Sequence, residues 1–127
     1  MSTEPGVLLA PKTLLAACDD DPVLLDTLIR VFKANISGSL AQVQEAITRA
    51  DPERLRESAH QLRGLVSTFS TKAAQAAALL EAMGVGGEFG DAASTFGTLT
   101  DMIGRLEQLL ENLQIDDLRR LAGRARD

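Results

Sequence analysis

His60 is the only histidine among the 127 residues of the chain, and it is the residue best suited to covalent chemistry. Imidazole has a reference pKa of about 6.5, so much of it is neutral and nucleophilic near neutral pH. Arg56 and Arg63 lie four residues before it and three residues after it, which is about one turn to either side in a helix. Guanidinium groups hold phosphoryl oxygens by charge-assisted hydrogen bonds. If His60 became phosphorylated, the two arginines could hold the added oxygens; they could equally form surface ion pairs with Glu53 or Glu57, each of little energetic value.

The direction of His60 on its predicted helix decides whether a partner could reach the ring. A lone histidine in a helical protein is usually structural or a solvated surface residue. At about 100° per residue, the apolar residues of this segment point within about 40° of a common direction, and His60 points about 140° away from it. These apolar residues are Leu55, Ala59, Leu62, Val66 and Phe69. We therefore expect His60 to face outward.

Gly64 lies four residues after His60, beside the ring on the helix surface. Glycine inside a helix costs about 1 kcal/mol relative to alanine, and an exposed position offers no gain in packing. The functional interpretation is that Gly64 clears space for another protein to approach the imidazole. The alternative, a glycine that is merely tolerated, stays equally open at this point.

The other motifs do not indicate further chemistry. No GxxxxGKS or GxxxxGKT loop is present, and the glycines between residues 84 and 90 do not match GxGxxG, so we expect no kinase activity of the chain's own and no cofactor. One histidine and one cysteine cannot form a zinc site unaided. Helix capping explains the acidic run 19–21 better than calcium binding does. We expect no metal, and we expect Cys18 to be packed at one end of the fold.

Helix signals recur along the chain, and strand patterns are almost absent. Asp21–Pro22 and Asp51–Pro52 each place a capping carboxylate before a proline in the first helical turn. Apolar spacing predicts long helices over about residues 22–49, 51–70, 71–84 and 91–113. The weak middle of the first, at 37–39, allows a bend, Thr71 caps the third, and residues 85–90 form a flexible connection.

These elements predict an all-α fold in which four amphipathic helices bury one apolar stripe each. We expect an antiparallel four-helix bundle over residues 10–114, with a short N-terminal helix at about 12–18 closing one end. Residues 115–127 are expected to add a short basic helical extension or tail, because four arginines fall between Arg119 and Arg126.

Composition limits the partners. The chain is 45% hydrophobic, which suffices for one domain with a sizeable core. Its formal net charge of −5 disfavours a nucleic-acid partner. It holds no apolar run of about 18 residues and no secretory signal, so we expect no membrane contact. A single cysteine is typical of a reducing compartment, and we expect a cytoplasmic protein.

The string SAHQLRGLVSTFS at residues 58–70 resembles the signature of the histidine-containing phosphotransfer (HPt) domain family, in which a small residue precedes HxxKG. Ala59 is the small residue, Arg63 takes the usual lysine position, and Gly64 is the motif glycine. The order of helices is also similar over about residues 10–114. Two departures stand out: Arg63 has a larger, planar head than lysine, and Ser70 stands where many members have a glycine, although a serine there can cap the next helix.

The resemblance implies a phosphorelay intermediate. His60 would accept a phosphoryl group on Nε2 from the aspartate of a receiver domain and pass it to another receiver, and the receiver would supply an acidic pocket and Mg²⁺. Arg63 and Gly64 would stabilise the phosphoryl group or support the site, and Arg56 and Ser67 would belong to the docking face, with part of the first long helix nearby. The partners implied are response-regulator receiver domains, a hybrid histidine kinase, or both, and a monomer suffices for this chemistry. Two alternatives remain: a helical adaptor that binds a kinase or receiver without carrying phosphate, and a generic structural bundle.

Overall fold

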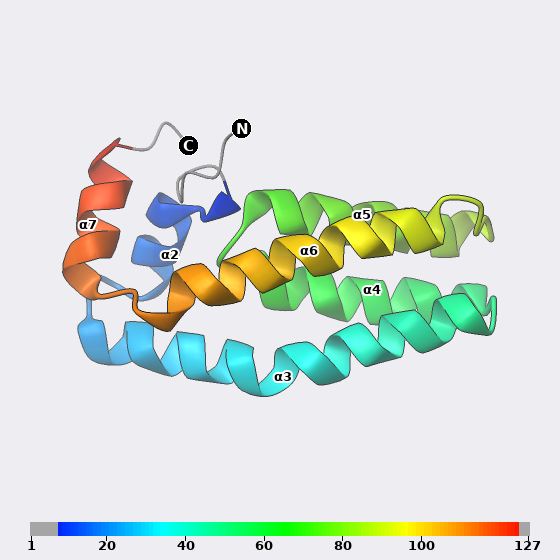
Figure 1. The fold of residues 1–127 in the computed structure, drawn as a ribbon, viewed down its shortest axis with the longest axis horizontal. Helices are drawn as coiled ribbons and strands as arrows, with labels where there is room; N and C mark the ends of the chain where they lie inside the picture. The colour runs from blue at the N-terminus through cyan, green and yellow to red at the C-terminus, as the bar shows by residue number, and fades with distance from the viewer. Residues whose placement is uncertain (1–7, 125–127) are drawn as a thin grey trace.

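The computed structural model describes residues 8–124, and among them all regular structure is helical. Figure 1 shows long helices packed side by side, with short helices across one end. They are α2 (Pro11–Ala17), α3 (Pro22–Thr48), α4 (Pro52–Val66), α5 (Thr71–Gly86), α6 (Ala92–Glu111) and α7 (Ile115–Arg124). The predicted all-α fold is therefore confirmed.

The predicted helix starts are set by side-chain caps. Asp21 accepts a hydrogen bond from the Val23 amide at 2.9 Å, and Asp51 accepts one from the Arg54 amide at 3.2 Å. Each satisfies an amide that has no partner within the helix. The cap of α5 differs from the prediction: Ser70, not Thr71, accepts from the Ala73 amide, at 3.1 Å. Ser70 has an extended backbone that leaves its hydroxyl free to cap, and Thr71 is already helical.

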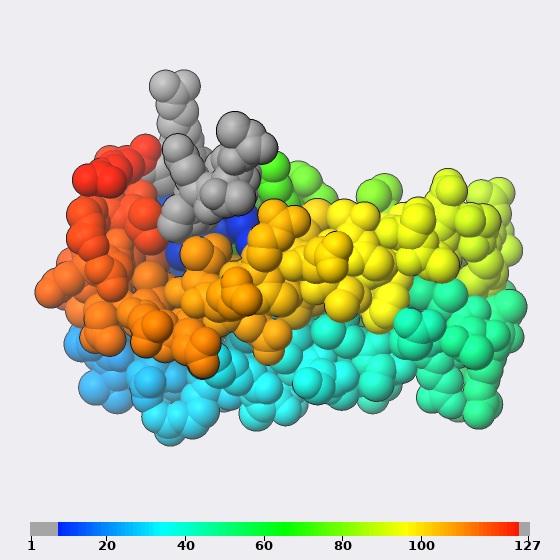
Figure 2. Space-filling model, in the orientation of Figure 1, coloured from blue at the N-terminus to red at the C-terminus, as the bar shows by residue number. Residues whose placement is uncertain are grey.

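The four long helices run antiparallel in sequence order, with α3 and α6 in front of α4 and α5 in the view of Figure 1. Short connections between consecutive helices favour this arrangement. The space-filling view shows the side chains of α6 and α3 meeting along the visible face (Figure 2). α3 stays helical through residues 37–39, and its axis changes direction near its middle.

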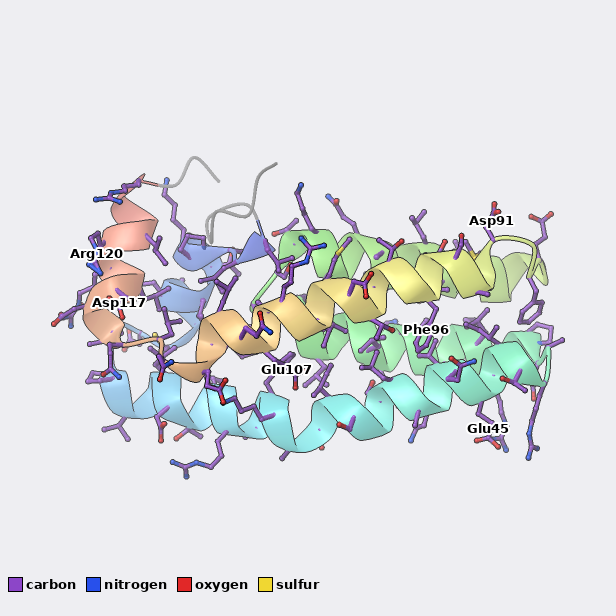
Figure 3. All side chains as sticks on the ribbon, in the orientation of Figure 1. Glu45, Asp91, Phe96, Glu107, Asp117 and Arg120 are labelled. Carbon is purple, nitrogen blue, oxygen red and sulfur yellow. The ribbon has the colours of Figure 1, made fainter. Side chains whose placement is uncertain are left out.

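The core is built from the predicted apolar stripes. All five inward residues of α4 and the segment after it, Leu55, Ala59, Leu62, Val66 and Phe69, are at most 3% exposed. The rings of Phe32 from α3 and Phe69 are 4.8 Å apart between centroids, which is a favourable spacing for an aromatic pair. Phe96 points inward from α6 and packs against this core (Figure 3). Burial of the stripe fixes which face of α4 is left for solvent.

Three helix ends differ from the predicted ones by two residues or more, and one of them is the end of α6, at Glu111 instead of residue 113. α4 stops at Val66, and residues 67–69 form a turn before Ser70. α5 continues past Gly84 to Gly86 and ends at Gly87, whose φ of 67° is left-handed and suits glycine. Gly84 was predicted as the stop of this helix, but it is a buried position within the helix. The connection between α5 and α6 therefore begins at Gly87 rather than at residue 85.

α2 and α7 pack against each other across one end of the bundle (Figure 1). Leu118 and Ala122 of α7 are buried, as is Cys18 after α2. Arg119 donates to the carboxylate of Asp20 at 2.6 Å and to that of Asp116 at 2.8 Å. Arg119 thus ties α7 to the acidic turn that precedes α3, whereas Arg120 pairs with Asp117 of its own helix and Arg126 lies outside the described residues.

Candidate functional site

His60 lies on the solvent face of α4, opposite the buried stripe. Its side chain is 61% exposed, which leaves the ring open to a partner. The predicted outward direction is confirmed. Ala59, directly before His60, and Leu62, two residues after it, are fully buried, so the backbone that carries the ring is held by the core.

The ring contacts α5 through one nitrogen. His60 Nδ1 lies 3.0 Å from Oε2 of Glu81 and 3.1 Å from Nη2 of Arg63. Glu81 is only 21% exposed, against 61% for His60, so the carboxylate lies below the ring in the seam between α4 and α5. The second ring nitrogen, Nε2, has no partner within residues 8–124.

The two contacts of Nδ1 compete for it. A protonated Nδ1 donates to the Glu81 carboxylate, whereas an unprotonated Nδ1 accepts from the Arg63 guanidinium, and one nitrogen cannot do both. In the neutral ring, the first arrangement leaves a lone pair on Nε2, and the second puts the proton there. Glu81 therefore favours the tautomer that is nucleophilic at the exposed nitrogen.

Arg63 also contacts Glu81 directly. Its Nε lies 3.0 Å from Oε1 of Glu81, but this buried N–H has no hydrogen-bond partner of good geometry. The contact is an ion pair rather than an aligned hydrogen bond. The Arg63 side chain as a whole is 41% exposed, so the outer N–H groups of its guanidinium, rather than the buried Nε, could donate to a phosphoryl group on the ring.

Arg56 forms the surface ion pairs with glutamates of its own helix that the sequence offered as the alternative to phosphoryl binding. Its Nη2 is 2.6 Å from Glu53 and 3.7 Å from Glu57. The hydrogen bond and charge of Arg56 lower the pKa of Glu53 below its usual value, and Glu53 in return raises the pKa of Arg56. Among the described residues, the ion-pair partners of Arg56 are thus glutamates of its own helix, and none of its hydrogen bonds goes to His60.

Gly64 and Ser67 continue the exposed face of α4 beyond His60. Gly64 has open space where a Cβ would stand, with no atom within 4 Å. Ser67 is exposed and donates from its hydroxyl to the Gly64 carbonyl at 3.3 Å. On this side of the ring, the helix surface therefore carries no side chain at Gly64 and only a short one at Ser67.

Sequence reasoning missed Glu81. It lies 21 residues from His60, and α5 is so rich in alanine that its apolar pattern gives little indication of which residue meets α4. No group of three or more histidine, cysteine, aspartate or glutamate residues able to hold a metal ion occurs between residues 8 and 124. In the same range no helix is long and apolar enough to cross a membrane.

A family model described as "Hpt domain" matches residues 27–116, which is most of the chain and includes α4 with His60. The chain belongs to the Hpt domain family. Hpt proteins are phosphotransfer carriers rather than kinases, and family membership gives this chain a carrier role in two-component signalling. Such proteins interact with receiver domains and kinases.

The Hpt fold is also seen in a solved structure. The crystal structure of histidine-containing phosphotransfer protein B from Pseudomonas aeruginosa PAO1 matches with a TM-score of 0.77 and 18% identity. The match covers 94% of this chain and 98% of that chain. At this identity it shows the common fold. No curated protein sequence matches this chain closely enough to count as a relative.

Proposed function

We propose that this chain is a phosphorelay intermediate that carries the phosphoryl group on Nε2 of His60. The observation that carries the proposal is the exposed ring whose Nδ1 is engaged by Glu81 at 3.0 Å, which leaves Nε2 facing solvent. A buried ring, or one bound through Nε2, would not suit group transfer. We place the exchange in the cytoplasm, in keeping with the single cysteine of the chain.

The transfer needs little beyond an accessible nucleophile in the right tautomer. The Nε2 lone pair attacks the phosphorus of a receiver phospho-aspartate, so that a P–N bond forms and the P–O bond to the aspartate breaks. The aspartate leaves as a carboxylate within the receiver, whose Mg²⁺ offsets the charge. The Nδ1 proton stays on the ring, where the Glu81 carboxylate stabilises the positive charge that develops. The reverse sequence passes the group to a second receiver aspartate.

Arg63 is the proposed phosphoryl-stabilising residue. Its guanidinium is already within 3.1 Å of the ring, and its side chain is 41% exposed, so its outer N–H groups can turn toward a phosphoryl group. Charge-assisted hydrogen bonds to phosphoryl oxygens are among the stronger ones available to a protein. The motif position usually holds lysine, whose ammonium group acts as a point charge. The planar guanidinium of Arg63 can instead offer two N–H donors to one phosphoryl group.

The proposed docking face comprises Gly64 and Ser67 of α4, with Arg56 at its edge. A shallow hollow lies next to it between α3 and α4, lined by Asn35, Gly38, Ser39, Gln42, Gln61 and Leu65. Gln61 follows His60 directly, so the hollow extends the face onto α3. A receiver that approaches the ring would cover both surfaces.

The alternative is an adaptor that binds a receiver or kinase and never carries phosphate. The two functions differ in whether label stays on the chain. Purified protein is mixed with a receiver that carries a radiolabelled phosphoryl group, and a second, unlabelled receiver is added later. The relay predicts label first on this chain and then on the second receiver. Binding of both receivers with no label on the chain would favour the adaptor. We propose no autonomous kinase activity, since the sequence holds no nucleotide-phosphate loop.

A further inference from the structure

At Gly84 the backbone of α5 lies close against the backbone of α4. A Cβ added there would stand 2.5 Å from the amide nitrogen of Arg56, 2.9 Å from its Cα and 2.9 Å from the carbonyl oxygen of Pro52. All three atoms are backbone, so no side-chain rotation can relieve the overlap. By contrast, Gly64 and Gly104 have no atom within 4 Å of an added Cβ.

This approach lies one turn from the site. On α5, Glu81 precedes Gly84 by three residues, and on the antiparallel α4, His60 follows Arg56 by four. At 1.5 Å per residue these steps are about 4.5 and 6 Å along the two axes. The contact at Gly84 and the contact between Glu81 and His60 therefore belong to the same seam, where α4 and α5 make the most extensive helix pairing among residues 8–124.

We propose that Gly84 is a positioning residue of the phosphotransfer site: by admitting α5 to backbone contact with α4, it sets the distance at which Glu81 reaches Nδ1 of His60. The proposal rests on the proposed function and deepens it. It makes the helix spacing, and not only the identity of Glu81, a determinant of which ring nitrogen is nucleophilic.

The distances are sensitive enough for this role. An added methyl group would require the backbones to separate by about 0.9 Å, the difference between 2.5 Å and the 3.4 Å at which ordinary contact begins. Protein N–H···O hydrogen bonds lie within about 2.7–3.2 Å, so the 3.0 Å contact between Glu81 and His60 has little slack. His60 and Arg63 both lie on α4 and each is 3.0 Å from the Glu81 carboxylate of α5, so a separation of the two helices stretches both contacts together. Loss of the contact leaves Arg63 as the partner of Nδ1 and moves the proton to Nε2.

The opposing explanation is that Gly84 serves stability alone, as any glycine at a tight crossing does. A spectroscopic readout separates the two, because His60 is the only histidine and its ring ¹⁵N signals are unambiguous in protein freed of any tag. At about pH 9, well above the reference pKa of imidazole, these signals report which nitrogen holds the proton. The proposal predicts the Nδ1–H form in the wild type and a shift toward the Nε2–H form in Gly84→Ala. Gly104→Ala, on the exposed face of α6, is the matched control and should keep the wild-type spectrum.

Glu81→Asp tests the same distance without touching the crossing, and it serves if Gly84→Ala does not fold. The shorter side chain should shift the ring signals as Gly84→Ala does, with an unchanged melting temperature. Both variants should slow acceptance of phosphoryl groups about tenfold, the size expected for one charge-assisted hydrogen bond. Wild-type ring signals in Glu81→Asp would overturn the proposal.

A double-mutant cycle completes the test. If Gly84 acts through Glu81, then Gly84→Ala slows transfer in the wild-type background but adds nothing to Glu81→Ala. An equal slowing in both backgrounds would overturn the proposal and leave Gly84 a packing residue. The proposed function fails separately: a wild-type chain that takes no label on His60 contradicts the relay, while the ring signals still decide whether the spacing sets the tautomer.

Discussion

His60 of α4 and Glu81 of α5 are joined by a 3.0 Å contact between Nδ1 and Oε2. The contact crosses the seam between two helices and involves the ring nitrogen that faces the protein. It gives the exposed nitrogen a defined role, because the tautomer that donates to Glu81 carries its lone pair on Nε2. An outward histidine is thus oriented from beneath by a half-buried carboxylate.

Replacing Glu81 should slow phosphoryl transfer to His60, and the loss should be larger the less the new side chain can accept a hydrogen bond from Nδ1–H. Glu81→Ala removes the partner of Nδ1–H, and we expect a rate about tenfold lower. Glu81→Gln keeps an amide oxygen at the same reach but not the charge, so its loss should be smaller. Rates of transfer from one phosphorylated receiver, measured for the three proteins side by side, check this order. Wild-type rates in both variants would show that Glu81 does not orient the ring.

Arg63 should govern how long the phosphoryl group stays on the chain. In Arg63→Ala the phospho-imidazole loses its nearest cation, and we expect the transfer equilibrium to move about tenfold toward the receiver aspartate. Arg63→Lys restores the usual motif residue and should retain most of the wild-type value. The measurement is the ratio of labelled chain to labelled receiver at equilibrium. Arg30→Ala, which alters an exposed ion pair on α3, is the matched control; an equal shift in that variant would contradict a local role for Arg63.

Gly64→Ala should make the protein more stable and less active. The position has open space for a methyl group, and alanine inside a helix is favoured over glycine by about 1 kcal/mol. The same methyl group stands beside the ring, where a receiver must approach, so transfer should slow. Urea denaturation and transfer rates are measured on the same samples, with Gly97→Ala on α6 as the control that should gain stability alone. Unchanged transfer in Gly64→Ala would mean that the glycine is merely tolerated.

Most of what lies on α4 could be predicted from the sequence, because helical periodicity fixes directions within one helix. The apolar stripe defined the buried face, and His60, Arg63 and Gly64 then followed as a neighbouring set on the outside. The partner from α5 could not be predicted in this way. Which residue of α5 meets His60 depends on the axial register of two helices, and periodicity within a helix carries no information about register.

The position of Gly84 between two helices could not be predicted from the sequence either. A glycine after an alanine-rich helical segment is typical of a helix end, and Gly84 was predicted as one. Its actual role depends on the backbone of Arg56, 28 positions earlier in the chain, at 2.5 Å from where its Cβ would be. The predicted cap of α5 was wrong by one residue. Ser70 and Thr71 can both cap a helix, and only the extended backbone at Ser70 decides between them.

The end of the molecule formed by α7 should weaken in acid. Asp117 pairs with Arg120 on the outer surface of α7 (Figure 3), at 2.5 Å, and accepts from the Gln114 amide at 3.1 Å. These contacts lower the pKa of Asp117 below its usual range, and the hydrogen bond from Arg120 has the largest effect. A carboxyl whose pKa is lowered by folding stabilises the protein above its unfolded pKa of about 3.9, and this is lost as the pH falls through the folded value.

We therefore expect Asp117→Asn to destabilise the protein at pH 7 and to approach the wild type as the pH falls through the lowered pKa of Asp117. Urea denaturation at several pH values checks the convergence. Asp101→Asn, at an exposed position within α6, is the matched control. A stability difference between wild type and Asp117→Asn that stays constant with pH would show that the ionised carboxylate is not what stabilises α7.

The most direct test of the relay is the chemical identity of the bond formed on His60. Wild-type protein and His60→Gln are incubated with a phosphorylated receiver and Mg²⁺, and the label on each chain is followed through treatment with alkali and with acid. The account predicts label on the wild type that resists alkali and is released by acid, as a phospho-imidazole is, and no label on His60→Gln. Label that persists in His60→Gln, or a wild type that binds phosphorylated receivers and stays unlabelled, would contradict it.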